Sequence, residues 1–433
     1  MNTMISSPSR GLNGKFRVPG DKSISHRSVM LGSLAEGVTE VSGFLEAEDA
    51  LATLKTFQAM GVNIERLGEG KLRIHGVGLH GLKAPEGDLY VGNSGTSMRL
   101  LSGILAGQSF DSVLTGDNSL SKRPMRRVLD PLALMGAEVG STDKGTSPLK
   151  INGGKSLMGI RYDMPMGSAQ VKSCLLLAGL YAEGTTTVVE PAVTRDHTER
   201  MLRGFGYEVK SEGNVAFLQG GGRLKGMKID VPADISSAAF FLVAASITPN
   251  SDITLEHVGI NPTRTGVIDI LLQMGADIEL LNERVVGGEK VADIRVKSSQ
   301  LKGIDVPEEL VALAIDEFPV IFVAAAYAKG KTVVSGAEEL RVKESDRIQT
   351  MADGLQALGV DAQATGDGMI IKGGLVRGGE IESFDDHRIA MAFAVAGLQS
   401  EAAIKINNCE NVSTSFPSFV GLASNCGFEI DAQ

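Results

Sequence analysis

The sequence predicts an α/β protein made of six similar units, arranged as two domains of three units each. A helix that ends in glycine and passes into a strand occurs six times, and a second helix, rich in small apolar residues, lies between those copies. The length agrees, because 433 residues divided by six gives about 72 per unit. A unit of helix, strand, helix and strand buries its apolar faces only when it stacks on its neighbours.

The glycine-ended helices mark the units most regularly. In each, glycine follows the last apolar turn, where left-handed backbone ends a helix, and a short strand comes next. The glycines are Gly61, Gly136, Gly206, Gly275, Gly359 and Gly427. They are 75, 70, 69, 84 and 68 residues apart. This near-even spacing favours duplication over accidental similarity within one α/β protein.

The second set of helices begins at polar or small residues and continues into small apolar side chains. The expected ranges are 20–31, 92–101, 166–177, 232–243, 315–326 and 384–395. Alternating strands follow at 37–44, 184–191, 251–258, 330–337 and 401–408, with a weaker one at 108–116. These patterns predict buried helices that pack under sheet.

The domain boundary is expected where the pattern is interrupted, at Val231 to Asp234. One domain should span 20–232, with repeats one to three. The other should combine 233–433, with repeats four to six, and residues 1–19, which can cross back to it. The two crossings would form a hinge.

Composition excludes several classes of protein. The chain carries 42 Lys and Arg against 52 Asp and Glu, a net charge of −10, which argues against a broad nucleic-acid surface. Its apolar runs, such as 320–328, are shorter than the roughly 18 residues that a membrane span needs. The start has no signal-peptide core, and three cysteines form no paired framework. We expect a soluble, cytoplasmic protein.

Cations cluster at the helix starts and between them, although the protein is acidic overall. They are Lys22, Arg27, Arg99, Lys122, Arg123, Arg126, Arg127, Lys172, Arg195, Arg264, Lys343, Arg347 and Arg388. A helix N-terminus also favours anions, and arginine suits phosphate and carboxylate. The expected ligand is one small molecule, or a pair, with several negative groups.

Acidic residues stand among these cations and could act as general base and general acid. They are Asp316, Glu317, Glu344, Asp346, Asp385 and Asp386. For Asp234, Asp316 and Asp386, capping of the following helix is an equally good interpretation.

Other chemical motifs match part of a known pattern but lack the neighbouring residues that the pattern needs. Residues 76–81 match a dinucleotide fingerprint as letters, but Pro85 and Gly87 stand where its helix belongs. Residues 330–332 resemble a phosphate loop without its first glycine. No histidine pair has metal-ligand spacing, and no cysteine lies in an activating loop. The sequence therefore predicts neither a metal nor a cofactor.

Nine short motifs occur together in order along the chain. They are GDKSISHR (20–27), GNSGTSMRLL (92–101), SKRPM (121–125), GSAQVKS (167–173), RDHTE (195–199), NPTRTG (261–266), IDEFP (315–319), RVKESDR (341–347) and DDHRIAM (385–391). This combination strongly resembles the 5-enolpyruvylshikimate-3-phosphate synthase family, nearly end to end. The resemblance implies two domains of three βαβαββ units each, an inside-out α/β barrel, which agrees with the sixfold repeat.

The resemblance implies an enzyme of the shikimate pathway, a 3-phosphoshikimate 1-carboxyvinyltransferase. Members transfer the enolpyruvyl group of phosphoenolpyruvate to the 5-hydroxyl of shikimate-3-phosphate and release phosphate. Both substrates are polyanions, as the cation pattern requires. The product feeds chorismate and aromatic amino-acid biosynthesis.

The family's functional residues carry over onto matching positions. For shikimate-3-phosphate they are Lys22, Ser23, Arg27, Ser168, Ala169, Gln170, Arg195, Asp316 and Lys343. For phosphoenolpyruvate they are Lys22, Gly95, Thr96, Arg123, Gln170, Arg347 and Arg388. The catalytic set implied is Lys22 as a bridging cation, Asp316 as base and Glu344 as acid. Domain closure around the substrates is expected to bring these groups together and exclude water.

Some positions match the family branch associated with tolerance to the inhibitor glyphosate. Ala169 and Thr414 differ from the serine and lysine of other branches, and RDHTE also fits. Some tolerant members, however, carry alanine where this chain has Gly95. The inhibitor response therefore stays open.

Two other functions remain as alternatives. A related enolpyruvyl transferase acts on UDP-N-acetylglucosamine, but its reactive cysteine loop has no counterpart here. A non-catalytic polyanion-binding protein of the same fold would need the cations but not the acid and base. We expect a monomer with small-molecule substrates and neither nucleic-acid nor membrane partners.

Overall fold

The computed structural model describes residues 2–433 and divides into two compact units. Unit 1 comprises the N-terminal segment to Pro19, Pro232–Val285 and Lys290–Gln433. Unit 2 comprises Gly20–Val231 together with Val286–Glu289. The expected division differs at two places, since Pro232 groups with unit 1 and the short segment after Val285 groups with unit 2. Each unit has its own hydrophobic core.

Unit 2 alternates helices and short strands. Its elements are α1 (Lys22–Leu34), β3 (Glu36–Ser42), α2 (Glu48–Ala59), β4 (Asn63–Gly68), β5 (Lys71–Val77), β6 (Leu89–Tyr90), α3 (Gly95–Ala106), β7 (Ser112–Thr115), η1 (Leu120–Lys122), α4 (Arg126–Leu134), β8 (Glu138–Gly140), β9 (Leu149–Asn152), β10 (Arg161–Asp163), α5 (Ala169–Gly179), β11 (Thr185–Val189), α6 (His197–Gly204), β12 (Val209–Glu212), β13 (Val215–Gln219) and β14 (Lys228–Asp230).

Unit 1 begins with two strands from the N-terminus and continues after the crossing at Pro232. Its elements are β1 (Thr3–Ser7), β2 (Asn13–Phe16), α7 (Ile235–Ile247), β15 (Asp252–Gly259), α8 (Gly266–Gln273), β16 (Asp277–Val286), β17 (Glu289–Lys297), α9 (Glu308–Val311), η2 (Ala312–Ala314), α10 (Phe318–Tyr327), β18 (Lys331–Val334), η3 (Glu338–Val342), α11 (Arg347–Ala357), β19 (Asp361–Ala364), β20 (Met369–Lys372), β21 (Gly379–Glu382), α12 (His387–Ala396), η4 (Gly397–Gln399), β22 (Ile404–Asn407), η5 (Glu410–Thr414), α13 (Phe419–Cys426) and β23 (Glu429–Ala432).

The three sheets of unit 2 share one strand order. They run β14-β3-β5-β4, β6-β7-β9-β8 and β10-β11-β13-β12. In each, the first pair is parallel and the other pairs are antiparallel. A βαβαββ repeat produces this order when its last two strands form a hairpin that pairs with the middle strand. The first repeat takes its opening strand, β14, from the far end of the unit.

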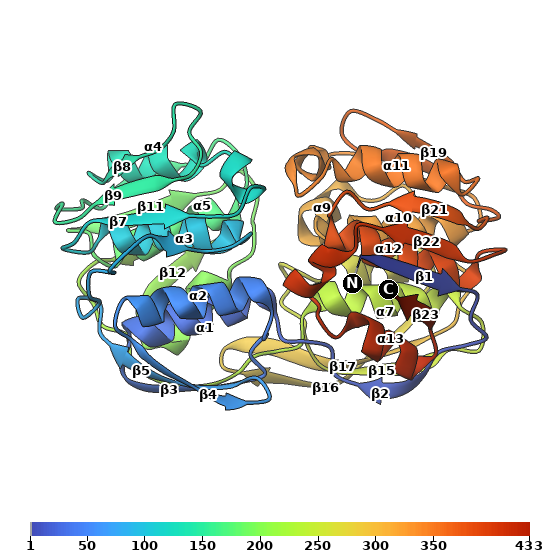
Figure 1. Ribbon diagram of the computed structural model, residues 1–433, viewed down its shortest axis with the longest axis horizontal. Coiled ribbons are helices and arrows are strands. Elements are labelled where there is room, and N and C mark those ends of the chain that lie inside the picture. The colour runs from blue at the N-terminus through green and yellow to red at the C-terminus, as the bar shows by residue number, and fades with distance from the viewer. Residues whose placement is uncertain (1) are drawn as a thin grey trace. The chain divides into compact units, whose positions relative to one another are not determined.

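Unit 1 repeats the plan with strands borrowed from the N-terminus. Its sheets run β2-β15-β17-β16, β18-β20-β19 and β21-β22-β1-β23. Strand β2 opens the fourth repeat, and β1 lies between β22 and β23 in the sixth, where Figure 1 shows it as a blue strand among red ones. In the fifth repeat the opening strand is reduced to two bridges, Lys302 with Lys329 and Asp305 with Val333.

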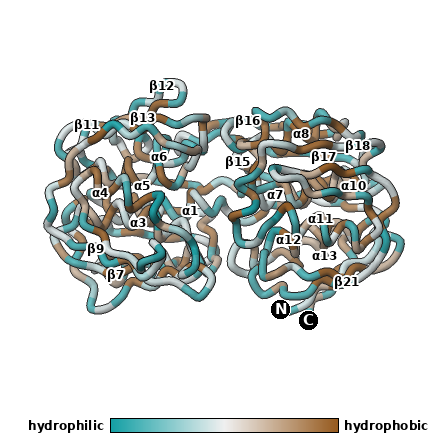
Figure 2. The backbone as a smooth tube through the Cα atoms, turned by 90° about the horizontal axis from the view of Figure 1, so that it is seen from above, coloured by the Kyte–Doolittle hydropathy of each residue, from teal (hydrophilic) through white to brown (hydrophobic). Residues whose placement is uncertain are grey.

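The predicted elements are confirmed. All six glycines that end helices have positive φ, between +81° and +117°, and a strand follows each one. The small-residue helices are α1, α3, α5, α7, α10 and α12, and each is buried over most of its length. In Figure 2 hydrophobic segments gather inside each unit, whereas many outer loops are hydrophilic. No helix in the described part of the chain is long and apolar enough to cross a membrane.

Candidate functional site

The start of α1 carries the first group of predicted site residues. Asp21 caps the helix by accepting from the backbone N–H of Ile24 at 2.8 Å. The Lys22 ammonium forms an ion pair with the buried carboxylate of Asp49, in α2. The cap fixes where the helix begins, so Lys22 lies in its first turn, where the helix dipole also favours an anion.

Arg27 lies one turn further along α1 and is almost fully buried. Its guanidinium donates to Thr198 Oγ1 at 2.7 Å, to Ser173 Oγ at 2.9 Å and to the Ser23 carbonyl at 3.0 Å. Burial lowers the pKa of Arg27 to about 10, and the nearby charge of Arg195 acts in the same direction. The side chain is therefore still cationic at neutral pH and is held rigidly beside α5 and α6.

The start of α3 meets the start of α5. Arg99 donates to the Gln170 side-chain oxygen, and the Gln170 amide donates to Thr96 Oγ1 at 3.0 Å. A Cβ at Gly95 would lie 3.1 Å from the Arg99 guanidinium and 3.4 Å from that of Arg123. Glycine therefore allows both cations to approach the first turn of α3.

Buried hydroxyl groups and one histidine connect these helix starts. His26 Nδ1 lies 2.8 Å from Thr53 Oγ1, which lies 2.6 Å from Ser97 Oγ. Ser168 caps α5, with the Val171 N–H at 3.4 Å from its hydroxyl, so Ala169 is the first residue of that helix. Hydrogen bonds thus join the first turns of α1 and α3 through α2, and those of α3 and α5 through Gln170.

Unit 1 brings together the predicted acids and the remaining cations. Asp316 Oδ1 lies 3.5 Å from Lys343 Nζ and 3.6 Å from Arg347 Nη1. Glu344 Oε2 lies 2.6 Å from Arg347 Nη2, and Asp316 Oδ1 faces a different nitrogen of that guanidinium. Arg388 Nη1 donates to the Asp316 carbonyl at 2.9 Å. The expected base and acid therefore share one arginine.

The centre of this group is a buried ion pair. Arg347 Nε lies 2.8 Å from Asp386 Oδ2, and both side chains are at most 1% exposed. Burial opposes both charges and is the largest single effect on each pKa. The carboxylates of Asp386, Glu344 and Asp316 together outweigh it at Arg347 and hold the pKa of that guanidinium above its usual range. The guanidinium in turn holds the pKa of Asp386 below its usual range. Both groups stay charged because each compensates the other.

The structure separates the two interpretations of the helix-start aspartates. Asp234 caps α7 and Asp386 caps α12, with accepted N–H bonds of 2.8 Å and 3.0 Å. Asp316 does not cap α10, because that helix begins after Glu317 without a side-chain cap. Of the three carboxylates, only that of Asp316 caps no helix, and it lies beside both Lys343 and Arg347.

Two residues that contact predicted site residues have no signal of their own in the sequence. Asp49 pairs with Lys22, and Asn93 accepts from Arg123 at 2.7 Å. Asp49 looks like an ordinary acid in the first turn of α2, and Asn93 like a turn residue. Their partners lie about 27 and 30 residues away in the chain, so no local pattern in the sequence indicates these contacts.

Some predicted features have a structural role. Lys172 is buried between Glu190 and Glu199, at 2.8 Å from each, so it holds α5 to α6. All three cysteines are free and buried, and burial raises the pKa of Cys174 to about 12. Within residues 2–433, no cluster of three His, Cys, Asp or Glu side chains could hold a metal ion.

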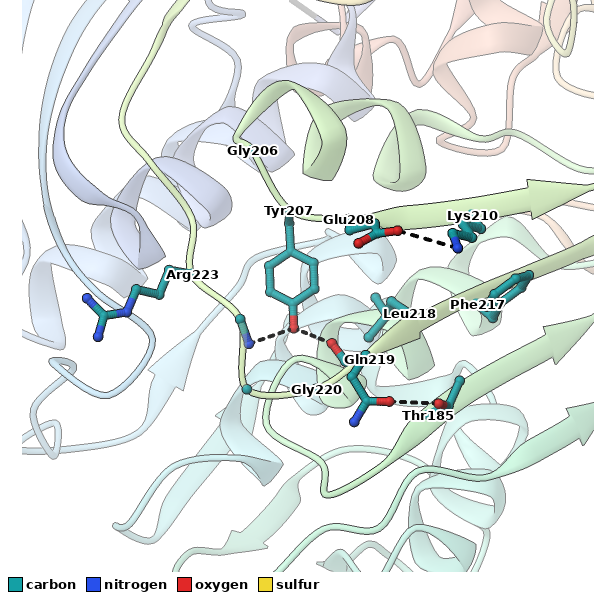
Figure 3. A pocket seen from close by; sticks show the side chains of 12 residues that line it. Thr185, Gly206, Tyr207, Glu208, Lys210, Phe217, Leu218, Gln219, Gly220 and Arg223 are labelled. Carbon is teal, nitrogen blue, oxygen red and sulfur yellow. Dashed lines mark hydrogen bonds and ion pairs between the residues drawn. The ribbon is translucent and has the colours of Figure 1, made fainter.

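An open pocket of about 530 Å³ lies elsewhere on unit 2. It is bordered by β12, β13 and the loop at 220–223, and Tyr207 hydrogen-bonds across it to the Gln219 carbonyl and the Gly222 N–H (Figure 3). None of the residues that line it belongs to the candidate site. The polar groups of this pocket are thus separate from the helix starts.

The fold and the site define a class: an α/β repeat protein that gathers cations at the starts of its buried helices and, in unit 1, carboxylates in the loops beside them. The family model for EPSP synthase (3-phosphoshikimate 1-carboxyvinyltransferase) matches residues 7–422. The chain therefore belongs to the EPSP synthase family. The expected fold, two domains of three βαβαββ repeats in an inside-out α/β arrangement, is confirmed with it.

Individual relatives are similar along almost the whole chain. The 3-phosphoshikimate 1-carboxyvinyltransferase of Methylococcus capsulatus is 66% identical over 98% of both chains. That of Nitrosococcus oceani is 64% identical over 98% of this chain and 96% of its own. A solved EPSP synthase structure from Acinetobacter baumannii is 60% identical, covers 100% of both chains and has a TM-score of 0.91.

Proposed function

We propose that this chain transfers the enolpyruvyl group of phosphoenolpyruvate to the 5-hydroxyl of shikimate-3-phosphate and releases phosphate. The observation that carries the proposal is the family match from residue 7 to residue 422, with relatives named for this reaction at 58–66% identity. The candidate residues support it, because polyanionic substrates need converging cations and the chemistry needs an acid and a base.

Shikimate-3-phosphate is assigned to groups at the starts of α1 and α5, to the loop before α6, and to two residues of unit 1. They are Lys22, Ser23, Arg27, Ser168, Ala169, Gln170, Arg195, Asp316 and Lys343. Arg27 supports this assignment, because three hydrogen bonds fix its guanidinium before any ligand arrives.

Phosphoenolpyruvate is assigned to the α3 start and to the arginines. Its contacts are Lys22, Gly95, Thr96, Arg123, Gln170, Arg347 and Arg388. The absence of a side chain at Gly95 leaves the Arg123 guanidinium close to the backbone of α3. Phosphate and carboxylate can then meet planar arginine forks.

In the reaction, Asp316 accepts the proton of the 5-hydroxyl as that oxygen attacks the enolpyruvyl carbon. Glu344 delivers a proton to the methylene carbon, and Lys22 stabilises the charge that develops at the reacting centre. The tetrahedral intermediate then loses phosphate together with a proton from its new methyl group, which restores the carbon–carbon double bond and gives the product. The contacts of Asp316 and Glu344 with Arg347 support these roles, because one cation orients both carboxylates.

Phosphate release tests the reaction directly. Purified protein should release phosphate from phosphoenolpyruvate only when shikimate-3-phosphate is present, with a product heavier by one enolpyruvyl group. Release with UDP-N-acetylglucosamine in its place would favour the related transferase. Tight binding without release would favour a non-catalytic polyanion-binding protein.

We further propose that the chain resembles the glyphosate-tolerant branch, although it has Gly95 where some tolerant members carry alanine. Ala169 and Thr414 support this, and the Thr414 hydroxyl donates to the Asn411 carbonyl at 2.7 Å, where other branches have a lysine. An inhibition constant for glyphosate far above the Michaelis constant for phosphoenolpyruvate would support tolerance. A value well below that constant would refute tolerance.

The protein is proposed to act as a cytoplasmic monomer on small-molecule substrates, without nucleic-acid or membrane partners. Its acidic balance and lack of a disulfide framework support this. Light scattering of the purified chain should give a mass near 45.5 kDa.

A further inference from the structure

Glu317 is a buried carboxylate that lies between two arginines of unit 1. It is 2% exposed and directly follows Asp316. Its Oε1 atom is 3.9 Å from Arg388 Nη1 and 3.7 Å from Arg264 Nη2, and the Ser236 hydroxyl donates to it. In the described part of the chain the other oxygen, Oε2, has no hydrogen-bond partner. The two guanidinium groups therefore provide most of the charge compensation for this buried acid.

Glu317 helps to fix the direction of Arg388. The Nη1 atom that faces Glu317 also donates to the Asp316 carbonyl at 2.9 Å. The backbone N–H of Arg388 is held by the Asp386 carboxylate at 3.0 Å. The Arg388 side chain is therefore held at both its backbone and its guanidinium. This lowers the side-chain entropy that is lost when an anion binds to it.

Arg264 contacts Glu317 from the loop that precedes α8. It is 3% exposed, and its Nη2 atom donates to Ser236 Oγ at 2.6 Å and lies 3.4 Å from Asp234 Oδ1. The group as a whole balances two positive and two negative charges. Without Arg264, Glu317 would be compensated by Arg388 alone, and the attraction between those two would compete with any anionic ligand of Arg388.

We propose that Arg264 is a positioning residue for the phosphoenolpyruvate site. It shares the charge of Glu317, so that Arg388 keeps its charge and its orientation for the anionic substrate. Arg264 itself does not touch the substrate. The inference rests on the proposed function, in which Arg388 binds phosphoenolpyruvate.

The test compares Michaelis constants for the two substrates. Arg264→Gln should raise the constant for phosphoenolpyruvate by about tenfold and change that for shikimate-3-phosphate by less than about twofold. Adding Glu317→Gln should recover much of the loss, because it removes the competing charge. Arg264→Lys should stay within about threefold of the wild type.

The double variant distinguishes charge sharing from a simple packing role. Losses that add up in the double variant, or equal changes in both Michaelis constants for Arg264→Gln, would overturn the proposal. Should Arg264→Gln fail to fold, Ser236→Ala keeps both charges and removes only the hydroxyl between them. It should raise the phosphoenolpyruvate constant by about threefold, and an unchanged constant would overturn the proposal.

A matched control is Arg295→Gln on β17 of the same unit. Arg295 pairs with Asp252 at 2.6 Å, and both side chains are about two-fifths exposed, so neither constant should change. Wild-type phosphate release tests the proposed function separately. A structure of the Arg264→Gln variant tests the positioning role without any measurement of activity. A direct hydrogen bond between Arg388 and Glu317 in that structure would support the role, and an unmoved Arg388 would refute it.

Discussion

Buried charges at helix starts are the main residue-scale feature of this protein. Arg347 with Asp386 in unit 1 and Arg27 in unit 2 are almost fully buried, yet each has partners that keep it charged. Removal of one partner from such a group leaves an uncompensated charge, which costs more than the pair contributes. Substitutions that keep the shape and remove only the reactive function are therefore the informative ones.

Asp316→Asn should lower kcat by about 10² to 10⁴, because the amide cannot accept the proton of the substrate hydroxyl. The fold should be retained, since Asp316 is partly exposed and caps no helix. Steady-state phosphate release measures the effect. The exposed Asp361 of the same unit is the control, and Asp361→Asn should have wild-type kcat. Full turnover by Asp316→Asn would remove it from the mechanism.

His26 should make unit 2 sensitive to acid. Burial, with the charges of Lys22 and Arg27, holds the pKa of His26 well below its usual range. Below about pH 6.5 the unfolded chain takes up a proton that the folded chain does not. Stability is therefore lost as pH falls, by roughly 1 kcal/mol per pH unit from this group.

His26→Gln should weaken that pH dependence, whatever its effect on stability at neutral pH. The measurement is the free energy of unfolding at pH 7.5 and at pH 5.5 for both chains. The exposed His80 of the same unit is the control, and His80→Gln should keep the wild-type difference. An unchanged difference in the His26 variant would mean that this histidine does not cause the acid sensitivity.

At the scale of elements, the glycine that ends each outer helix sets where the next strand begins. Gly427 ends α13 with φ of +117°, and a Cβ there would lie 2.6 Å from the Gly11 carbonyl oxygen. This position has both a left-handed backbone and a close approach of another segment. Any residue with a side chain at this position would therefore cost more free energy than the preference of glycine for helix ends alone would predict.

Gly427→Ala should destabilise unit 1 by about 2 kcal/mol, from the left-handed backbone and the contact with Gly11. Gly421, inside α13, is a matched control because a Cβ there meets nothing within 4 Å. Gly421→Ala should stabilise by about 0.5 kcal/mol. Urea unfolding of the two variants checks both signs, and equal effects would contradict the role of the helix end.

At the scale of the whole molecule, two separate cores define the stability. Phe241 belongs to the core of unit 1 and Phe57 to that of unit 2, and both are fully buried. Three βαβαββ repeats pack around each core. Because each core is built from the repeats of its own unit, a substitution in one core can destabilise that unit by itself.

Phe241→Ala should cost about 3–5 kcal/mol in unit 1. Hydrogen exchange of the native protein should then lose protection in α7 and α10 and keep it in α2 and α3. Phe57→Ala should give the reverse pattern. Equal loss in both units for either variant would show that the molecule unfolds as one cooperative unit.

The sequence predicted the repeat because its signals are local. A glycine after a helix, or small residues along a buried one, acts through backbone geometry within a few residues, and all six copies at Gly61 to Gly427 were confirmed. The hairpin partners such as β5 and β17 were not singled out from the residue pattern, because strand preference depends more on cross-strand neighbours than on the residues themselves.

Local sequence determined the sixfold repeat, the buried helices and, through the family motifs, the candidate reaction. Only the tertiary structure decided how the charges are compensated: that Asp316 faces Lys343 and Arg347 while Asp234 and Asp386 cap helices, that Lys172 is a structural cation, and that β1 completes the last sheet. The physical reason is that the free energy of a buried charge, or of a strand inserted between two others, depends on partners far away in the chain, which folding alone brings within bonding distance.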